Sequence, residues 1–233
     1  MNNIAKILLA CVLLGIATPA LAQDDTDELR ITALEALLMA PPERAMPIVQ
    51  RVLAGDGSDE VKERALFVLS QIDTPEAQAL LVDTARNSSG ELKFEAIRMI
   101  GIGGNAEAMS ALTDLYASGD ADVREAVLEA YLIADDTDAV YNIARNTEDP
   151  DEFEEAVEIL AAMGAVEELR SLSDRSGMGD ALIEAYMIAG DDETVLQLFR
   201  EAQDPAEKRR LLEILVMMDS EAVWDIIDQT LEQ

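Results

Sequence analysis

The chain has 233 residues, and 48 acidic against 17 basic residues give it a formal net charge of −31 at pH 7. It contains no histidine and one cysteine, which excludes Ser-His-Asp and Cys-His catalysis and every zinc site that contains histidine. So acidic a surface disfavours nucleic acid and anionic lipid as partners, and it would attract a basic protein or cations, although solubility or a saline habitat also explains it.

The first 22 residues have the organisation of a secretory signal peptide. Lys6 precedes an apolar run from Ile7 to Ala17, and Ala20-Leu21-Ala22 offers a small-residue cleavage site. Because spanning a bilayer takes about 20 apolar residues, a retained membrane anchor is the weaker alternative. We therefore expect a cleaved leader over residues 1–22, a mature domain over residues 23–233, and localisation in a periplasm or outside the cell.

The sequence after the leader repeats itself. Residues 129–145 and 184–200 are identical at about half of their aligned positions, without a gap. An Ile or Met near the end of an apolar stretch, usually followed by a small or turn-forming residue, recurs roughly every 30 residues. It occurs at Met39, Ile72, Ile102, Ile133, Met163, Ile188 and Met218. The interval predicts about seven repeated units.

Each unit is predicted to contain two helices. First helices are expected where apolar residues at i, i+1 and i+4 form one stripe, around residues 65–69, 96–100, 126–130 and 156–160. Second helices are expected after the recurring Ile or Met, with core valines at Val140, Val195 and Val223. A composition rich in Leu, Ala and Glu, with only 4% aromatic residues, agrees with an all-α fold. Because one helix pair cannot bury its apolar face alone, the pairs are expected to stack into an α-solenoid.

Three short segments resemble the openings of HEAT-like repeats of the short kind that also occurs in phycocyanobilin lyases: VKERAL (61–66), LKFEAI (92–97) and DVREAV (122–127). PERAMPIVQRVLAGD (42–56) is similar to that family's second helix, including an early proline at Pro47. The resemblance implies a solenoid that offers interaction surfaces. It does not carry lyase activity to this chain, and the histidine-dependent di-iron chemistry of other HEAT-repeat enzymes is excluded. Tetratricopeptide repeats, with a period of about 34 residues, fit less well.

One interval is shorter than the others, between Met163 and Ile188. The missing residues fall around residues 173–180, where Gly177 and Gly179 weaken a helix. This pattern predicts a shortened first helix, from a simple deletion or, alternatively, at a hinge.

Acidic clusters such as Asp135-Asp136-Thr137-Asp138 suggest either cation binding or helix capping. None of them continues with the spaced ligands and distal Glu of an EF-hand, so capping explains them better, and no metal site is assigned. Asp149-Pro150 and Asp204-Pro205 are likewise predicted to cap and open first helices.

A binding surface is the best functional candidate. Tyr141, Leu196 and Trp224 each follow the core valine of a second helix, and together they would form an apolar ridge on the concave face. Alternatively, these side chains fill the packing between neighbouring units. We expect a non-catalytic adaptor without a cofactor that binds another protein. Because the surface of the chain is acidic, this partner is expected to be basic. The alternative is an exported acidic protein that binds a small ligand or a cation.

Overall fold

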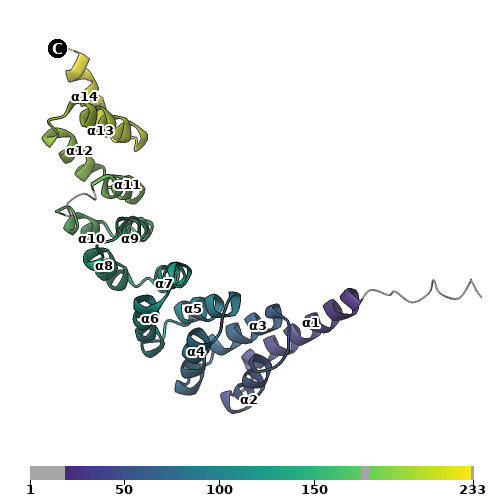
Figure 1. The fold of residues 1–233 in the computed structure, drawn as a ribbon. Coiled ribbons are helices and arrows are strands. Elements are labelled where there is room, and N and C mark those ends of the chain that lie inside the picture. The colour runs from purple at the N-terminus through teal and green to yellow at the C-terminus, as the bar shows by residue number, and fades with distance from the viewer. Residues whose placement is uncertain (1–18, 175–178, 232–233) are drawn as a thin grey trace, which may run out of the picture. The chain divides into compact units, whose positions relative to one another are not determined.

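The computed structural model describes residues 19–174 and 179–231, without the side chains of residues 19–25, 229 and 230. Within this part all regular elements are helices: fourteen α-helices and one 3-10 segment, connected by short turns (Figure 1). Most of the predicted leader lies outside the described residues, and residues 19–22 form the first turn of α1. None of the described helices combines the length and the apolar character needed to cross a membrane.

The helices form seven consecutive pairs, as the repeat interval predicts. The first helices of the pairs are α1 (Pro19–Glu35), α3 (Asp59–Ser70), α5 (Glu91–Gly103), α7 (Ala121–Ala134), α9 (Pro150–Ala162), α11 (Gly179–Ala189) and α13 (Pro205–Met217). The second helices are α2 (Pro42–Leu53), α4 (Pro75–Asn87), α6 (Ala106–Ser118), α8 (Thr137–Asn146), α10 (Val166–Ser171), α12 (Asp192–Glu201) and α14 (Ala222–Leu231). The 3-10 segment η1 (Ala36–Met39) extends α1.

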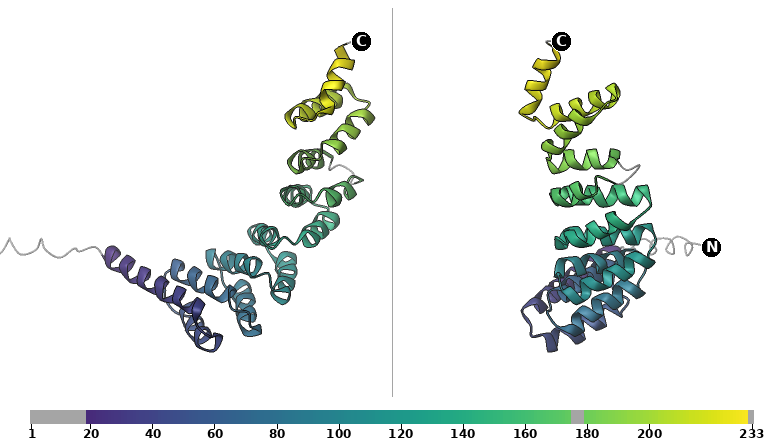
Figure 2. Two further views of the ribbon diagram at one scale, coloured as in Figure 1. Left: turned by 180° about the vertical axis from the view of Figure 1, so that it is seen from behind. Right: turned by 90° about the vertical axis from the view of Figure 1, so that its left-hand side faces the viewer.

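The chain divides into two compact units, Met1–Ala111 and Leu112–Gln233. In the N-terminal unit, α3 is the central helix and packs against α1, α2, α4 and α5. In the C-terminal unit, α9 packs against α8 and α11, and α12 packs against α13. Within this unit, α7, α9 and α11 follow one another in one layer and α8, α10 and α12 in a second layer (Figures 1 and 2). Each unit is therefore a stack of helix pairs.

The core consists of the apolar stripes that the sequence predicts. Leu66, Leu69, Ile97 and Ile100 on first helices are fully buried. The predicted core valines of second helices, Val140, Val195 and Val223, are buried as well.

Side-chain caps begin many of the helices. The carboxylate of Asp136 accepts a hydrogen bond from the backbone N–H of Ala139 at 3.1 Å, as predicted for this acidic cluster. Asp149 and Asp204 cap α9 and α13 in the same way, and a proline follows each of them at the first helical position. Asp135 differs from the prediction, because it is the left-handed residue that ends α7 rather than a cap of α8.

The shortening of the repeat affects the predicted first helix α11, which is the shortest of the first helices, but it affects the preceding second helix more. The shortest α-helix is α10, the second helix of the fifth pair, with 6 residues, whereas the first helix α11 has 11. The chain after α10 enters a turn at residues 172–174, and Gly177 lies outside the described residues. The deletion therefore removes about one and a half turns mainly from a second helix.

Candidate protein-binding surface

The turns inside the helix pairs of the C-terminal unit share one backbone conformation. Each contains a residue with φ between 53° and 73°, which is the left-handed region: Asp135, Gly164, Gly190 and Asp219. The N–H of the next residue reaches back to a carbonyl of the first helix, for example from Asp191 to Tyr186 and from Asp136 to Tyr131, both at 2.9 Å. This pattern is the Schellman helix ending, repeated in four successive pairs.

The residue two positions before each left-handed residue is exposed. In three of the four turns it is a large apolar residue: Ile133 (46% exposed), Ile188 (51%) and Met217 (67%). Four of the recurring residues that reveal the repeat are therefore on the surface instead of in the core: Met39, Ile102, Ile133 and Ile188. Exposed acidic residues such as Asp135 and Asp219 follow directly in the same turns. The turns thus present apolar side chains beside negative charge.

The predicted ridge residues differ in their surroundings. Tyr141 and Leu196 are half-buried, and the hydroxyl of Tyr141 accepts a hydrogen bond from Ser171 Oγ at 3.0 Å. Packing between neighbouring pairs therefore accounts for the buried part of these two side chains. Trp224 is 62% exposed, although the preceding Val223 is buried. Of the three, Trp224 offers the largest free surface to a partner.

The two similar segments each place a tyrosine in the contact between neighbouring helix pairs. The hydroxyl of Tyr131 lies 3.3 Å from the hydroxyl of Thr113 on α6, and that of Tyr186 donates to the carbonyl of Leu169 on α10 at 3.2 Å. Burial raises the pKa of both tyrosines, so they remain neutral hydrogen-bonding groups at physiological pH. Each tyrosine ties its first helix to the second helix of the preceding pair.

An ion pair between the partly exposed Arg170 and the buried Asp191 strengthens the contact between the fifth and sixth pairs. Arg170 on α10 donates from Nε and Nη2 to the carboxylate of Asp191 at 2.9 and 2.7 Å, and Asp191 also caps α12 by accepting from the N–H of Thr194. The Asp191 side chain is only 2% exposed. Burial alone would raise the pKa of Asp191, but the hydrogen bonds from Arg170 and Thr194 outweigh burial and lower it. The charged carboxylate of Asp191 therefore links the fifth helix pair to the sixth.

A second polar network joins four helices of the C-terminal unit. Glu152 on α9 accepts hydrogen bonds from Tyr116 on α6 at 2.6 Å, from Arg124 on α7 at 3.2 Å, and from Thr147 after α8. Tyr116, Thr147 and Glu152 border a cavity of about 450 Å³. The pKa of Tyr116 is raised, first by burial and then by its bond to Glu152, so this phenol does not act as a base. The network holds helices together and contains no activated nucleophile.

Sequence reasoning missed both networks, because the contacts of Glu152 with Tyr116 and of Arg170 with Asp191 join residues 36 and 21 positions apart, and no local pattern links them. The repeated turns, in contrast, had a visible signal in the recurring Ile or Met. Among the described residues, no group of three or more acidic side chains is arranged to hold a metal ion.

The fold defines this protein as an α-solenoid of short helix pairs. Residues 17–92 and 47–132 match the family of HEAT repeats, so this half of the chain belongs to the HEAT-repeat family, as its resemblance indicates. Among solved structures, the complex of CpcE and CpcF of phycocyanin lyase from Nostoc sp. PCC7120 is similar, with 18% identity, a TM-score of 0.40, and coverage of 72% of this chain and 74% of that chain. A likeness this low carries no argument about activity. No curated protein sequence matches the chain.

Proposed function

We propose that this protein is an exported, non-catalytic HEAT-repeat adaptor that binds another protein through the concave face of its solenoid, with Trp224 as the main anchor. The exposure of Trp224, directly after the buried Val223 on α14, is the observation that carries the proposal. Tryptophan is among the residues that most often dominate interface energies. Tyr141 and Leu196 would contribute the edges of their half-buried side chains to the same surface.

The charge of the chain selects the partner. With 48 acidic and 17 basic residues, the surface would steer a basic protein toward itself and repel acidic ones. Acidic residues such as Glu221 and Asp225 flank Trp224 directly. We therefore expect a partner with a basic rim around an apolar pocket, and an association that weakens with salt.

Export rests on the predicted leader at residues 1–22, which would deliver the protein to a periplasm or the extracellular space. Expression of the full chain in a bacterial host, followed by osmotic release and N-terminal sequencing, tests this step. A mature protein that begins at Gln23 is expected. Retention of Met1 in the cytosolic fraction would refute export.

The binding proposal is tested by capturing partners from an envelope extract with wild-type protein and with Trp224→Ala as bait. The matched control is Met39→Ala, which removes an apolar side chain that is 91% exposed in the other unit. A specific basic partner should bind the wild-type bait and elute with moderate salt. Trp224→Ala should lower the affinity for this partner by about 30-fold, whereas Met39→Ala should leave the affinity unchanged. Equal capture by all three baits would show that Trp224 is not the anchor. Circular dichroism should show unchanged helix content, because both side chains are exposed.

A further inference from the structure

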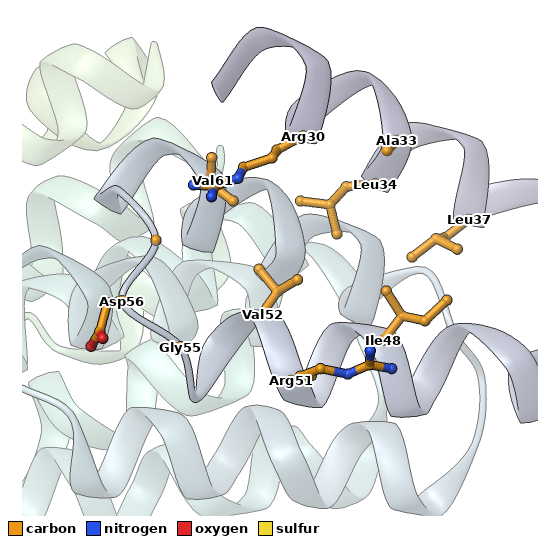
Figure 3. A pocket seen from close by; sticks show the side chains of 11 residues that line it. Arg30, Ala33, Leu34, Leu37, Ile48, Arg51, Val52, Gly55, Asp56 and Val61 are labelled. Atoms are coloured by element: carbon orange, nitrogen blue, oxygen red, sulfur yellow. The ribbon is translucent and has the colours of Figure 1, made fainter. Parts of the chain in front are cut away.

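A groove in the N-terminal unit lies at the first helix pair. Helices α1 and α2 both pack against α3 but only weakly against each other, and the space between them is a groove of about 520 Å³ (Figure 3). Leu34 from α1 and Leu37 from η1 face Ile48 and Val52 from α2 across it. The loop over residues 55–57 borders it as well. Its volume lies within the range of about 300–1,000 Å³ that is usual for small-molecule sites.

Two arginines border this apolar groove in a chain with a net charge of −31. Arg30 comes from α1 and donates to Asp27 at 3.1 Å, so part of its charge is already neutralised. Arg51 comes from α2 and makes no hydrogen bond or ion pair with the residues that the structure describes. Among the side chains that the structure describes, Asp56 is the single acidic one that lines the groove. Arg51 is therefore available to pair with an anion at the edge of an apolar surface.

We propose that this groove binds a single-chain amphiphile with an anionic head, such as a medium-chain fatty carboxylate. The carboxylate pairs with the guanidinium of Arg51, which can donate two parallel hydrogen bonds to it. The alkyl chain lies between Leu34 and Leu37 on one side and the apolar side chains of α2 on the other. This site is separate from the surface around Trp224 and does not depend on the adaptor function.

The test is calorimetric titration of the purified protein with decanoate, below its micelle concentration, and with decan-1-ol as the uncharged ligand of equal chain length. We expect one saturable site for decanoate. Each added methylene from octanoate to decanoate should raise the affinity by up to about fourfold as it enters the groove. Decan-1-ol should bind more weakly, by about the fivefold that one exposed ion pair contributes.

Three variants connect binding to the groove. Arg51→Gln should lower the affinity for decanoate by about fivefold and leave that for decan-1-ol unchanged. Ala33→Trp, which fills the groove from an exposed position of α1, should weaken both ligands. Arg44→Gln is the matched control, because Arg44 is an exposed arginine of the same helix α2 outside the groove.

Absence of saturable binding up to millimolar decanoate, or equal binding by Arg51→Gln and wild type, would overturn the proposal. The mass of the protein in solution should stay the same in Arg51→Gln. A change in mass without decanoate binding would assign the groove to a second copy of the chain and would equally overturn the assignment to an amphiphile.

Discussion

The two similar segments allow one prediction with an internal control. Asp136 and Asp191 occupy equivalent positions, and each caps the second helix of its pair through a backbone N–H, that of Ala139 or that of Thr194. Only Asp191 also binds an arginine, with bonds of 2.9 and 2.7 Å from Arg170. Replacing each aspartate by alanine therefore separates the contribution of the cap from that of the ion pair.

The expected magnitudes follow from these contacts. Loss of a helix cap costs about 1 kcal/mol, which is the full effect expected for Asp136→Ala. The carboxylate of Asp191 is 2% exposed and accepts charge-assisted hydrogen bonds, which contribute about 1.5–3 kcal/mol. Asp191→Ala should therefore destabilise the C-terminal unit by about 3 kcal/mol. The two variants should differ by about 2 kcal/mol at neutral pH.

Urea unfolding followed by far-UV circular dichroism measures the total change, and hydrogen exchange locates it. Because stacked repeats can open pair by pair, amides of α12 should lose protection in Asp191→Ala before those of α8 do. Asp136→Ala should affect α8 instead. Equal destabilisation by both variants would refute the view that the ion pair of Arg170 and Asp191 holds the fifth and sixth pairs together.

The pH dependence of this difference gives a second readout. The pKa of Asp191 is lowered below its ordinary value of 3.8 by the hydrogen bonds from Arg170 and Thr194, which outweigh burial. A carboxyl with a lowered pKa in the fold stabilises the protein above its unfolded pKa and loses this effect as the pH falls through its folded pKa. The gap between wild type and Asp191→Ala should be constant above about pH 5 and should narrow below about pH 4.

Three further outcomes are expected. The pKa of Glu155 is raised, first by burial and then by neighbours such as Glu125, so its charge opposes folding at neutral pH. Glu155→Gln should therefore stabilise the protein at pH 7 by less than about 1 kcal/mol. Urea titrations below pH 4 should show no gain in stability. Gly190 has φ 73°, so Gly190→Ala should destabilise the protein by about 1 kcal/mol. Asp135 at the equivalent turn has φ 56°, so Asp135→Gly should stabilise the protein. Unfolding temperatures that move the other way would contradict the shared turn geometry. Millimolar calcium at constant ionic strength should leave the unfolding temperature unchanged, because the acidic clusters act as caps and turns, and a rise would support cation binding.

Local features of the fold could be predicted from the sequence. The pairs of helices, the caps at Asp149 and Asp204 and the buried valines were predicted correctly, because periodicity and capping depend on residues within one or two helical turns. The shortened first helix was predicted in part, because α11 is the shortest first helix but the second helix α10 is shortened more. A deletion in a loop does not say which of the adjoining helices becomes shorter, since packing against neighbouring pairs decides this.

The candidate surface was predictable only in part. The pattern around Trp224 identified a residue after a buried valine, but the same pattern described Tyr141 and Leu196, which the structure shows to be half-buried. Exposure differs among the three because it depends on which helices lie alongside each position. The ridge as a partner-binding site stays a prediction.

By itself, the sequence determined that this chain repeats a short helix pair about seven times, because each pair carries its own stripe, cap and turn in a continuous stretch. Only the tertiary structure decided that Arg170 meets Asp191, that Glu152 joins four helices, and that Arg51 borders an open apolar groove. The first two features arise between residues of different helix pairs, and the groove depends on how the first two helices both pack against α3. Their positions depend on how successive pairs stack, and no local pattern of residues contains that information.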